Sequence, residues 1–255
     1  MNNIDAVLTA RNISKTYFST DPPVSVLNGI NVDVRRGEFL AVMGASGSGK
    51  STLLYCMSGM DRPTEGDVMF NGRDLTGLDD AAMSRIRLHE MGFVFQQAHF
   101  LPNLNIRDNI LLPAFKAQPR SQASVVQRVD GLLDRFGLAH VAGHGITEVS
   151  GGQLQRASIC RALAVEPSIL FADEPTGALN SSMSAEVMNA LTDVHRHGAT
   201  VVMVTHDPTC AARAERVAYL RDGQLVDTLE SGSWNPAQEE HRTRELTDWL
   251  RGLGF

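Results

Sequence analysis

The sequence predicts an α/β protein in which helices cover a mostly parallel sheet. The apolar run "EFLAVMG" (38–44) leads directly into a glycine-rich loop and then into the helical pattern "KSTLLYCMSGM". Two further apolar runs, "SILFADEP" (168–175) and "TVVMVTHD" (200–207), are separated by the helical pattern "SSMSAEVMNALTDVHRH". Short continuous apolar runs are typical of strands buried on both faces, and the strand–helix–strand order is typical of parallel sheets.

The remaining segments add antiparallel strands and more helices. "AVLTARNISKTY" (6–17) and "INVDV" (30–34) carry strand signals, and a turn follows at Arg36-Gly37, so we expect an antiparallel β subdomain here. Between residues 97 and 165 the strand signals vanish and helical patterns dominate, which indicates an inserted helical subdomain. The last segment, 235–255, has apolar residues at helical spacing and predicts a helix that packs on its own domain.

The composition is that of an ordinary globular protein. Among the 255 residues, 43% are apolar and 20% are charged, and the formal net charge is −6. This acidic balance argues against a nucleic-acid partner as the default. Cys56, Cys160 and Cys210 are scattered and odd in number, which indicates reduced thiols. The start lacks a signal-peptide pattern and no apolar run reaches the roughly 18 residues that cross a bilayer, so we expect a cytoplasmic chain.

The glycine-rich loop carries the strongest chemical signal in the chain. It fits the pattern G-x-x-x-x-G-K-[ST] and predicts a P-loop NTPase core, because its backbone N–H groups can wrap phosphates. Lys50 supplies a charge for the β- and γ-phosphates, and the Ser51 hydroxyl can bind Mg²⁺. A chance glycine turn is the alternative, but it would not explain the strand before the loop and the helix after it. The nucleotide-binding residues of this loop are Gly44, Ala45, Ser46, Gly47, Ser48, Gly49, Lys50, Ser51 and Thr52.

Two other apolar runs end in residues with suitable chemistry. Asp173 ends one run and Glu174 follows, at the sheet edge where ligands of open α/β sheets bind. Asp173 suits Mg²⁺, and Glu174 can reach the water that attacks the γ-phosphate. His206 ends the other run and could hydrogen-bond the γ-phosphate. The alternatives are a solvated acidic turn and an unrelated histidine at a strand end.

A second anion-binding helix start is predicted in "VSGGQLQRASICRAL" (149–163). Ser150 is a favourable N-cap, Gly151 and Gly152 expose the backbone, and an apolar-periodic helix follows. Such a helix start presents free N–H groups and a partial positive charge to an anion. One domain would therefore carry two such sites.

These motifs together resemble the ATP-binding subunits of ABC transporters, over roughly residues 6–230. Tyr17 in "SKTY" matches the aromatic residue that stacks on adenine, and Gln96 in "FVFQQ" matches the Q-loop. The segment "GALN" (177–180) takes the place of the D-loop, and His206 that of the switch histidine. The signature motif corresponds to Ser150, Gly151, Gly152 and Gln153.

The resemblance implies roles for these residues and for a second copy of the chain. Such domains dimerise head to tail, and each ATP lies between the phosphate loop of one copy and the signature motif of the other. Lys50, Glu174 and His206 would then be catalytic, with Glu174 as the general base. Ser51, Gln96 and Asp173 would hold Mg²⁺.

The resemblance also implies a domain organisation within residues 1–255. Residues 1–96 and 166–230 would form the nucleotide-binding core with its antiparallel β subdomain. Residues 97–165 would form the helical signature subdomain, and residues 231–255 a helical tail.

The sequence departs from the family pattern at two positions. The signature motif is preceded by Val149 instead of leucine, and the D-loop ends in Asn180 where the family usually has aspartate. Asn180 keeps the shape of aspartate and loses its charge, so communication between the two ATP sites is expected to differ in detail.

Within the family, "TEGDVMFNGRDLTGLDD" and "GFVFQQAHFLPNLNIRDNILLP" resemble the bacterial macrolide-exporter and lipoprotein-release branch, which includes antimicrobial-peptide resistance systems. We therefore expect a membrane permease as partner and a place on the inner face of the plasma membrane. The permease contact is expected near Phe100, Leu101 and Leu104, as an exposed apolar patch.

Two other functions stay open from the sequence. The first is a regulatory ATPase that acts through a permease-like partner on a cell-wall hydrolase or a sensor kinase, without transport. The second is a soluble DNA-repair or translation ATPase of the same superfamily. It is disfavoured because the chain has neither a long heptad insertion nor a second cassette.

Overall fold

The structure is a computed structural model that describes residues 6–19, 21–118 and 120–255. The chain divides into two compact units. The first unit combines the residues up to 83 with residues 199–255, and the second consists of residues 84–198. These bounds differ from the helical subdomain predicted at 97–165, which stays a prediction.

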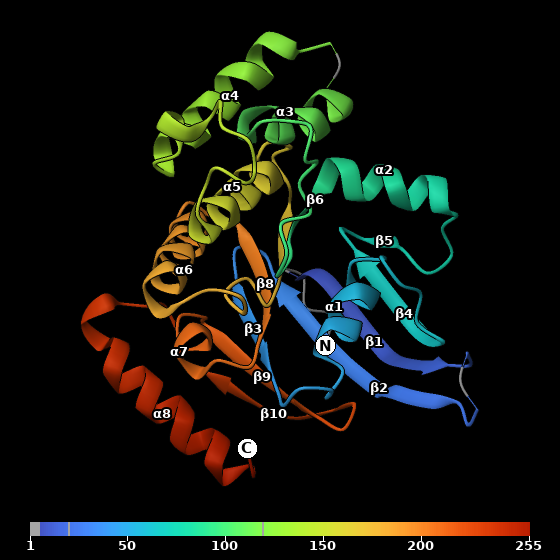
Figure 1. Cartoon of the computed structure of the whole chain (residues 1–255). Helices are drawn as coiled ribbons and strands as arrows, with labels where there is room; N and C mark the ends of the chain where they lie inside the picture. Colours follow the sequence, from blue (N-terminus) through green and yellow to red (C-terminus); the bar gives the residue numbers. More distant parts are fainter. Residues whose placement is uncertain (1–5, 20, 119) are drawn as a thin grey trace. The chain divides into compact units, whose positions relative to one another are not determined.

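The first unit contains an antiparallel sheet (Figure 1, blue to cyan). In this sheet β1 (Ala6–Tyr17) pairs with β2 (Val24–Arg35) and with β4 (Glu65–Phe70). A short strand, β5 (Arg73–Asp74), pairs with β4 and completes the sheet. The predicted antiparallel strands are therefore confirmed, whereas β4 and β5 had no sequence prediction.

The first unit also contains the strands that carry the phosphate loop. Here β3 (Phe39–Met43) runs parallel to β8 (Thr200–Thr205) on one side and to β9 (Arg216–Arg221) on the other. An antiparallel strand, β10 (Gln224–Glu230), pairs with β9. Every residue of β3 and β8 is buried, as the continuous apolar runs predicted.

Helices complete the first unit. The phosphate-loop helix is α1 (Lys50–Met57), and α7 (Pro208–Ala211) follows β8. After a short turn, η2 (Pro236–Gln238), the predicted C-terminal helix forms as α8 (Glu239–Gly252), drawn in red in Figure 1.

The α8 helix packs as its apolar spacing predicted. Leu246 and Leu250 are buried, and the Trp249 ring meets the Tyr219 ring edge-on at 6.3 Å between centroids. This contact connects α8 to β9, because Tyr219 lies in that strand.

The second unit consists mainly of helices around two parallel strands, β6 (Met91–Val94) and β7 (Ile169–Asp173). The residues described between 97 and 165 form helices and a single isolated bridge, so the predicted helical character is confirmed. The helices of this region lie together in Figure 1, in green to yellow. They are α3 (Ile106–Ala117), α4 (Gln122–Arg135), the short η1 (Ala139–Val141) and α5 (Gly151–Leu163).

Two more helices lie near the two ends of this unit's stretch of sequence. One is α2 (Asp80–Glu90), which begins within the residues of the first unit and ends within those of the second. The other is α6 (Ser181–Arg196), which follows β7 as the helical pattern predicted.

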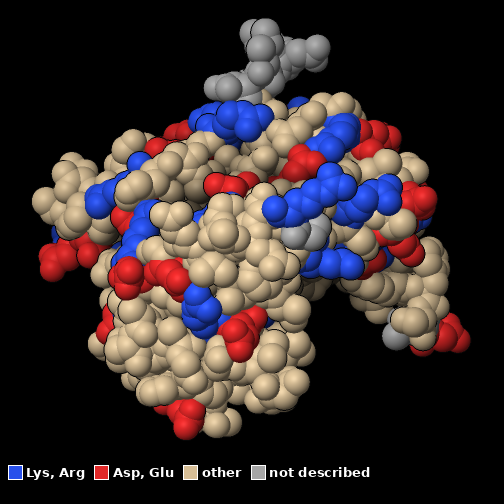
Figure 2. All heavy atoms as spheres, turned by 90° about the horizontal axis from the view of Figure 1, so that it is seen from above, with Lys and Arg blue, Asp and Glu red and all other residues tan. Residues whose placement is uncertain are grey.

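Surface charge is mixed on the face drawn in Figure 2. Lys and Arg side chains and Asp and Glu side chains both lie on this face, so charge of both signs is present there. In the part of the chain that the structure describes, no helix combines the length and the apolar character needed to cross a membrane.

Candidate functional site

The phosphate loop connects β3 to α1 in the first unit, and its backbone depends on glycine. Gly47 and Gly49 have φ angles of 81° and 101°, in the left-handed region that side chains disfavour. At Gly44 a Cβ atom would lie 2.2 Å from the Leu220 carbonyl oxygen, so no larger residue fits. The predicted strand–loop–helix arrangement is present, and no side chain caps the start of α1.

Two polar side chains of this loop suit an anionic ligand. Lys50 is only 5% exposed, and its ammonium group donates to the carbonyl oxygens of Gly44 and Ala45, at 3.0 and 2.9 Å. The Ser48 hydroxyl is buried and has no hydrogen-bond partner among the described residues. A buried ammonium group, an unpartnered hydroxyl and an uncapped helix start together fit the phosphates of a nucleotide.

His206 lies at the same sheet edge as the phosphate loop. Met43 and Thr205 are paired residues at the carboxyl ends of β3 and β8, so Gly44 and His206 each directly follow one of them. The next residue, Asp207, accepts a hydrogen bond from the Thr209 N–H at 2.8 Å and caps α7. The first unit therefore contains both the loop and the predicted switch histidine at one edge.

Tyr17 is the last residue of β1 and is 36% exposed. Its hydroxyl donates to Asp61 Oδ2 at 2.9 Å, and the Lys15 ammonium nitrogen lies 4.9 Å from its ring centroid. Burial and the neighbouring Asp61 carboxylate raise the pKa of the Tyr17 hydroxyl. Tyr17 is thus a partly exposed ring whose hydroxyl is held by hydrogen bonding.

The second unit brings together Gln96, Asp173 and Glu174. Val94 pairs with Ala172 in the parallel strands β6 and β7, so Asp173, the last residue of β7, lies at the same edge as Gln96 and Glu174, which follow these strands. A Cβ atom at Gly177 would lie 2.9 Å from Gln96 Nε2 and 3.3 Å from Glu174 Oε2. The Gln96 amide and the Glu174 carboxylate therefore approach the same small residue.

The backbone of this edge is unusual at one position. Glu174 has a φ of 43°, in the left-handed region that residues other than glycine adopt infrequently. Strained backbone of this kind concentrates at functional sites. Asp173, which precedes Glu174, is buried at 8% exposure.

The signature segment forms the capped helix start that the sequence predicted. The Ser150 side chain accepts from the Gln153 N–H at 3.2 Å, and the Gln153 side chain accepts from the Ser150 N–H at 2.8 Å. This reciprocal pair is a capping box. At Gly152 a Cβ atom would lie 3.2 Å from the Met183 side chain, so α5 begins close to the start of α6.

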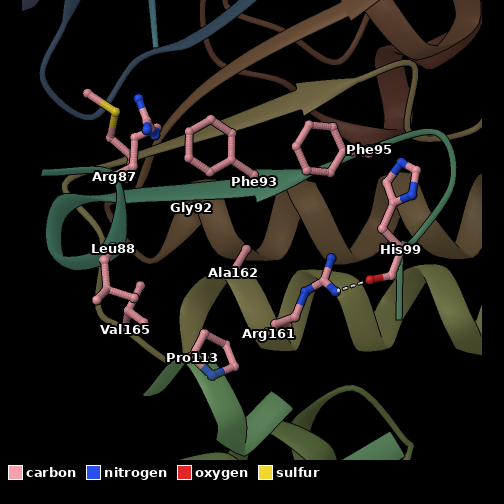
Figure 3. A pocket seen from close by; sticks show the side chains of 11 residues that line it. Arg87, Leu88, Gly92, Phe93, Phe95, His99, Pro113, Arg161, Ala162 and Val165 are labelled. Carbon is pink, nitrogen blue, oxygen red and sulfur yellow. Dashed lines mark hydrogen bonds between the residues drawn. The ribbon is translucent and has the colours of Figure 1, made fainter. Parts of the chain in front are cut away.

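A groove of about 320 Å³ lies within the second unit (Figure 3). The rings of Phe93, Phe95 and His99 form one side, with centroids 5.9 Å apart for Phe93–Phe95 and 5.6 Å apart for Phe95–His99. Pro113 and Arg161 lie on the opposite side in Figure 3. The groove is therefore mostly apolar and aromatic, with two arginines, Arg87 and Arg161, among its lining residues.

Arg161 connects the groove to the chain segment that follows β6. It donates to the carbonyl oxygens of Ala98 and His99, at 2.6 and 3.2 Å. Its guanidinium group lies 4.5 Å from the Phe100 ring centroid, and burial lowers its pKa to about 10.

The structure corrects the expected exposed patch at residues 100–104. Phe100 is buried because Arg161 covers its ring, and Leu104 is only partly exposed. Leu101 remains exposed, at 45%. The sequence analysis missed the groove itself, although the alternation of Phe93 and Phe95 around the buried Val94 was a signal for a second apolar face.

The loop and the sheet define the class of this chain. A glycine-rich loop with a buried lysine, between a buried parallel strand and a helix, is the phosphate-binding element of P-loop nucleotide-binding proteins. The fold class predicted from the sequence is confirmed.

The chain belongs to the ABC transporter family and is an ATPase domain of that family. Residues 27–177 match the family model described as "ABC transporter". A solved relative, the post-hydrolysis dimer of the ATP-binding cassette MJ0796 bound to ADP and Pi, is 36% identical with a TM-score of 0.82. That match covers 89% of this chain and 100% of the solved one.

Curated relatives include both long and short proteins. The macrolide export ATP-binding/permease protein MacB 2 of Aeromonas hydrophila is 41% identical over 88% of this chain and 34% of its own length. The pyoverdine export ATP-binding/permease protein PvdT of Pseudomonas entomophila is 44% identical over 89% of this chain and 35% of its own length. The ATP-binding protein YvrO of Bacillus subtilis is 41% identical over 86% of this chain and 96% of its own length. The chain thus spans about a third of the length of the two export relatives.

Proposed function

We propose that this chain is the ATP-binding and ATP-hydrolysing subunit of an ABC transporter, that it dimerises on Mg-ATP, and that it drives a membrane permease. The observation that carries the proposal is the phosphate loop, with its buried Lys50 and its unpartnered Ser48 hydroxyl. These groups suit the phosphates of a nucleotide, because a buried cation and free polar hydrogens can bind phosphate oxygens.

The proposed roles follow from the chemistry of each side chain. Lys50 and the loop N–H groups bind the phosphates, and His206 donates to the γ-phosphate. Ser51, Gln96 and Asp173 would hold Mg²⁺, which when bound neutralises charge on the phosphoryl group being transferred. Glu174 accepts the proton of the attacking water.

We propose that the second anion-type helix start, Ser150 to Gln153, completes the nucleotide site of a second copy. The two-fold symmetry of a dimer turns two different half-sites on one chain into two equal composite sites. The glycines Gly151 and Gly152 at the start of α5 support this role, because their backbone N–H groups lie at the positive end of a helix. The dimeric form of the MJ0796 cassette, to which this chain is similar, gives independent support.

We propose that the permease binds at the groove and the adjacent Leu101, on the inner face of the plasma membrane. The groove has the aromatic and apolar lining that a short helix of a partner requires. The helix α5 provides a connection to the nucleotide, because it begins with the signature segment and lines the groove through Arg161. Gln155 of the same helix donates to the Phe95 carbonyl oxygen at 2.7 Å.

The names of the relatives support export as the direction of transport. Two of them are named for the export of macrolides and of pyoverdine. From these relatives we infer only that the partner permease belongs to an export class. Antimicrobial peptides and lipoproteins are among the candidate substrates. A regulatory role without transport is the alternative outcome.

Glu174→Gln tests the proposed chemistry. This change keeps the shape of the side chain and removes its ability to accept a proton, so ATP binding is expected to persist while hydrolysis falls by about 10²–10⁴-fold. In the presence of Mg-ATP the variant is expected to elute as a dimer in size-exclusion chromatography. Hydrolysis at the wild-type rate, measured as phosphate release, would exclude Glu174 as the general base.

A matched control uses another acidic residue of the same unit. Glu186→Gln removes the charge of the half-exposed Glu186 on α6, which forms an ion pair with Arg156 of α5. This control is expected to hydrolyse ATP at the wild-type rate. An equal loss in both variants would indicate a general effect on the unit.

A further inference from the structure

Tyr17 belongs to a polar cluster that connects the end of β1 to the residues after α1. Asp61 Oδ2 accepts from the Tyr17 hydroxyl at 2.9 Å, and Asp61 Oδ1 lies 2.6 Å from the Lys15 ammonium nitrogen. The same ammonium group donates to the Arg62 carbonyl oxygen at 2.7 Å. One carboxylate thus bridges the aromatic hydroxyl and a lysine.

We propose that Asp61, supported by Lys15, is a positioning residue for the base of the nucleotide. It holds the Tyr17 ring in one orientation, so that the exposed part of the ring is ready to stack on adenine. This inference rests on the proposed function, in which Tyr17 is the stacking residue, and it assigns a role to the Tyr17 hydroxyl as well as to its ring.

The position of Asp61 relative to α1 supports this role. The backbone N–H groups of Met60 and Asp61 both donate to the Tyr55 carbonyl oxygen, at 2.9 and 3.2 Å. Tyr55 lies in the last turns of α1, whose first residue is Lys50 of the phosphate loop. The same short helix therefore carries the phosphate loop at its start and the carboxylate that orients Tyr17 just after its end. This arrangement fixes the base platform and the phosphate site in one rigid frame.

The electrostatics keep both partners in the forms that the hydrogen bond requires. Burial alone would raise the pKa of Asp61, but hydrogen bonds from Lys15 and Tyr17 outweigh it and lower the pKa below its usual value. Asp61 therefore stays ionised and remains an acceptor near neutral pH. The pKa of Tyr17 is raised, so its hydroxyl keeps the proton that it donates.

A purely structural role is the alternative. The Lys15–Asp61 pair connects β1 to the end of α1 and would stabilise the unit even if no base were bound. The two roles differ in which part of the nucleotide they affect. A positioning role affects the base and leaves the phosphates alone, whereas a loosened α1 would weaken phosphate binding as well.

The experiment compares ATP with inorganic tripolyphosphate, which has no base. Isothermal titration calorimetry on the full chain gives the dissociation constant of each ligand, with Mg²⁺ present. Tyr17→Ala is expected to weaken ATP binding by about 5- to 150-fold, from the loss of stacking. Tyr17→Phe and Asp61→Ala are each expected to weaken it by about 2- to 10-fold, from the loss of one hydrogen bond. Combined, they are expected to cost less than the sum of the two separate losses, because both remove the Tyr17–Asp61 hydrogen bond.

Tripolyphosphate binding is expected to stay within about twofold of wild type in all these variants, since stacking and its support act on the base alone. Asp80→Ala serves as the control, because Asp80 forms an exposed ion pair with Arg62, next to Asp61 in sequence. It is expected to bind both ligands as wild type does.

Each failure has a distinct meaning. If Tyr17→Ala leaves ATP affinity unchanged, the stacking role of Tyr17 fails and the inference fails with it. If Tyr17→Ala weakens ATP binding while Tyr17→Phe and Asp61→Ala do not, the positioning role alone is overturned. If Asp61→Ala weakens tripolyphosphate binding as much as ATP binding, Asp61 acts through the fold of α1 and the inference is wrong.

Discussion

The cysteines illustrate how burial controls chemistry at single residues. Cys56, Cys160 and Cys210 are buried and form no disulfide among the described residues, and burial raises the pKa of both Cys56 and Cys160 to about 12. At pH 8 only about one in 10⁴ of such thiols is ionised, and the thiolate is the reactive form. We expect slow labelling of Cys56 and Cys160 by a thiol reagent in the native protein and fast labelling of all three cysteines in guanidinium chloride. Mass spectrometry of labelled peptides identifies each site, and rapid native labelling at Cys56 or Cys160 would contradict this prediction.

Residue identity predicted some side chains of the candidate site better than others. Ser150 was expected as an N-cap, and the capping box with Gln153 confirms that expectation, because capping depends on local sequence alone. Phe100 was expected to be exposed but is buried. The prediction failed because Arg161, whose guanidinium group lies over the Phe100 ring, is far from Phe100 in sequence. The Tyr17–Asp61 hydrogen bond was not predicted either, because these two residues are also far apart in sequence. Contacts between distant residues leave no periodic signal.

At the scale of elements, Asn180 stands where the family usually has aspartate in the D-loop, and it keeps the helix-capping role. Its side chain accepts from the Met183 N–H at 3.0 Å and caps α6. Asparagine and aspartate cap helices about equally well, so the exchange keeps this function. Asn180→Ala is expected to cost about 1 kcal/mol, which lowers the thermal midpoint by about 2–4 °C, whereas Asn180→Asp is expected to match or slightly exceed wild type. Circular dichroism measures both. Asn103→Ala, at an exposed loop position, is the control, and an equal loss there would contradict the capping role.

The predicted elements are those with the strongest patterns. The strands β3, β7 and β8 were predicted because all their residues are buried and nearly all of them are apolar. In contrast β9 begins and ends with arginine, and β10 has no fully buried residue, so neither shows a clear apolar run. The place of β9 beside β3 depends on pairing between segments far apart in the chain, which local periodicity does not encode, and β10 is placed only through its pairing with β9.

At the scale of the whole molecule, the candidate site residues fall into two sets, one in each unit. The phosphate loop, Tyr17 and His206 belong to the first unit, while Gln96, Asp173, Glu174 and the signature segment belong to the second. The sequence predicted each of these motifs, because each depends on a few neighbouring residues. That both sets of residues bind the same ATP is a prediction of the proposed function.

The proposed contact with the permease is also a property of the whole molecule, and it can be tested at Leu101. Its backbone is fixed, because the buried Asn109 accepts from the Leu101 N–H at 2.7 Å and donates to the Leu101 carbonyl oxygen at 3.1 Å. The side chain nevertheless stays 45% exposed, next to the groove-lining segment. An exposed leucine on a rigid backbone is suited to insertion into a partner.

Leu101→Asp is therefore expected to weaken association with the permease by about tenfold to a hundredfold, the value of one buried leucine side chain. The measurements are co-purification with the permease and the ATPase activity of the assembly in nanodiscs, with ATP binding by the chain alone unchanged. Leu112→Asp is a matched control, because Leu112 is 50% exposed on α3 and does not line the groove. Equal losses in the two variants would indicate a general effect of surface charge. Normal association of Leu101→Asp, or its unfolding in isolation, would show that Leu101 does not form the permease contact.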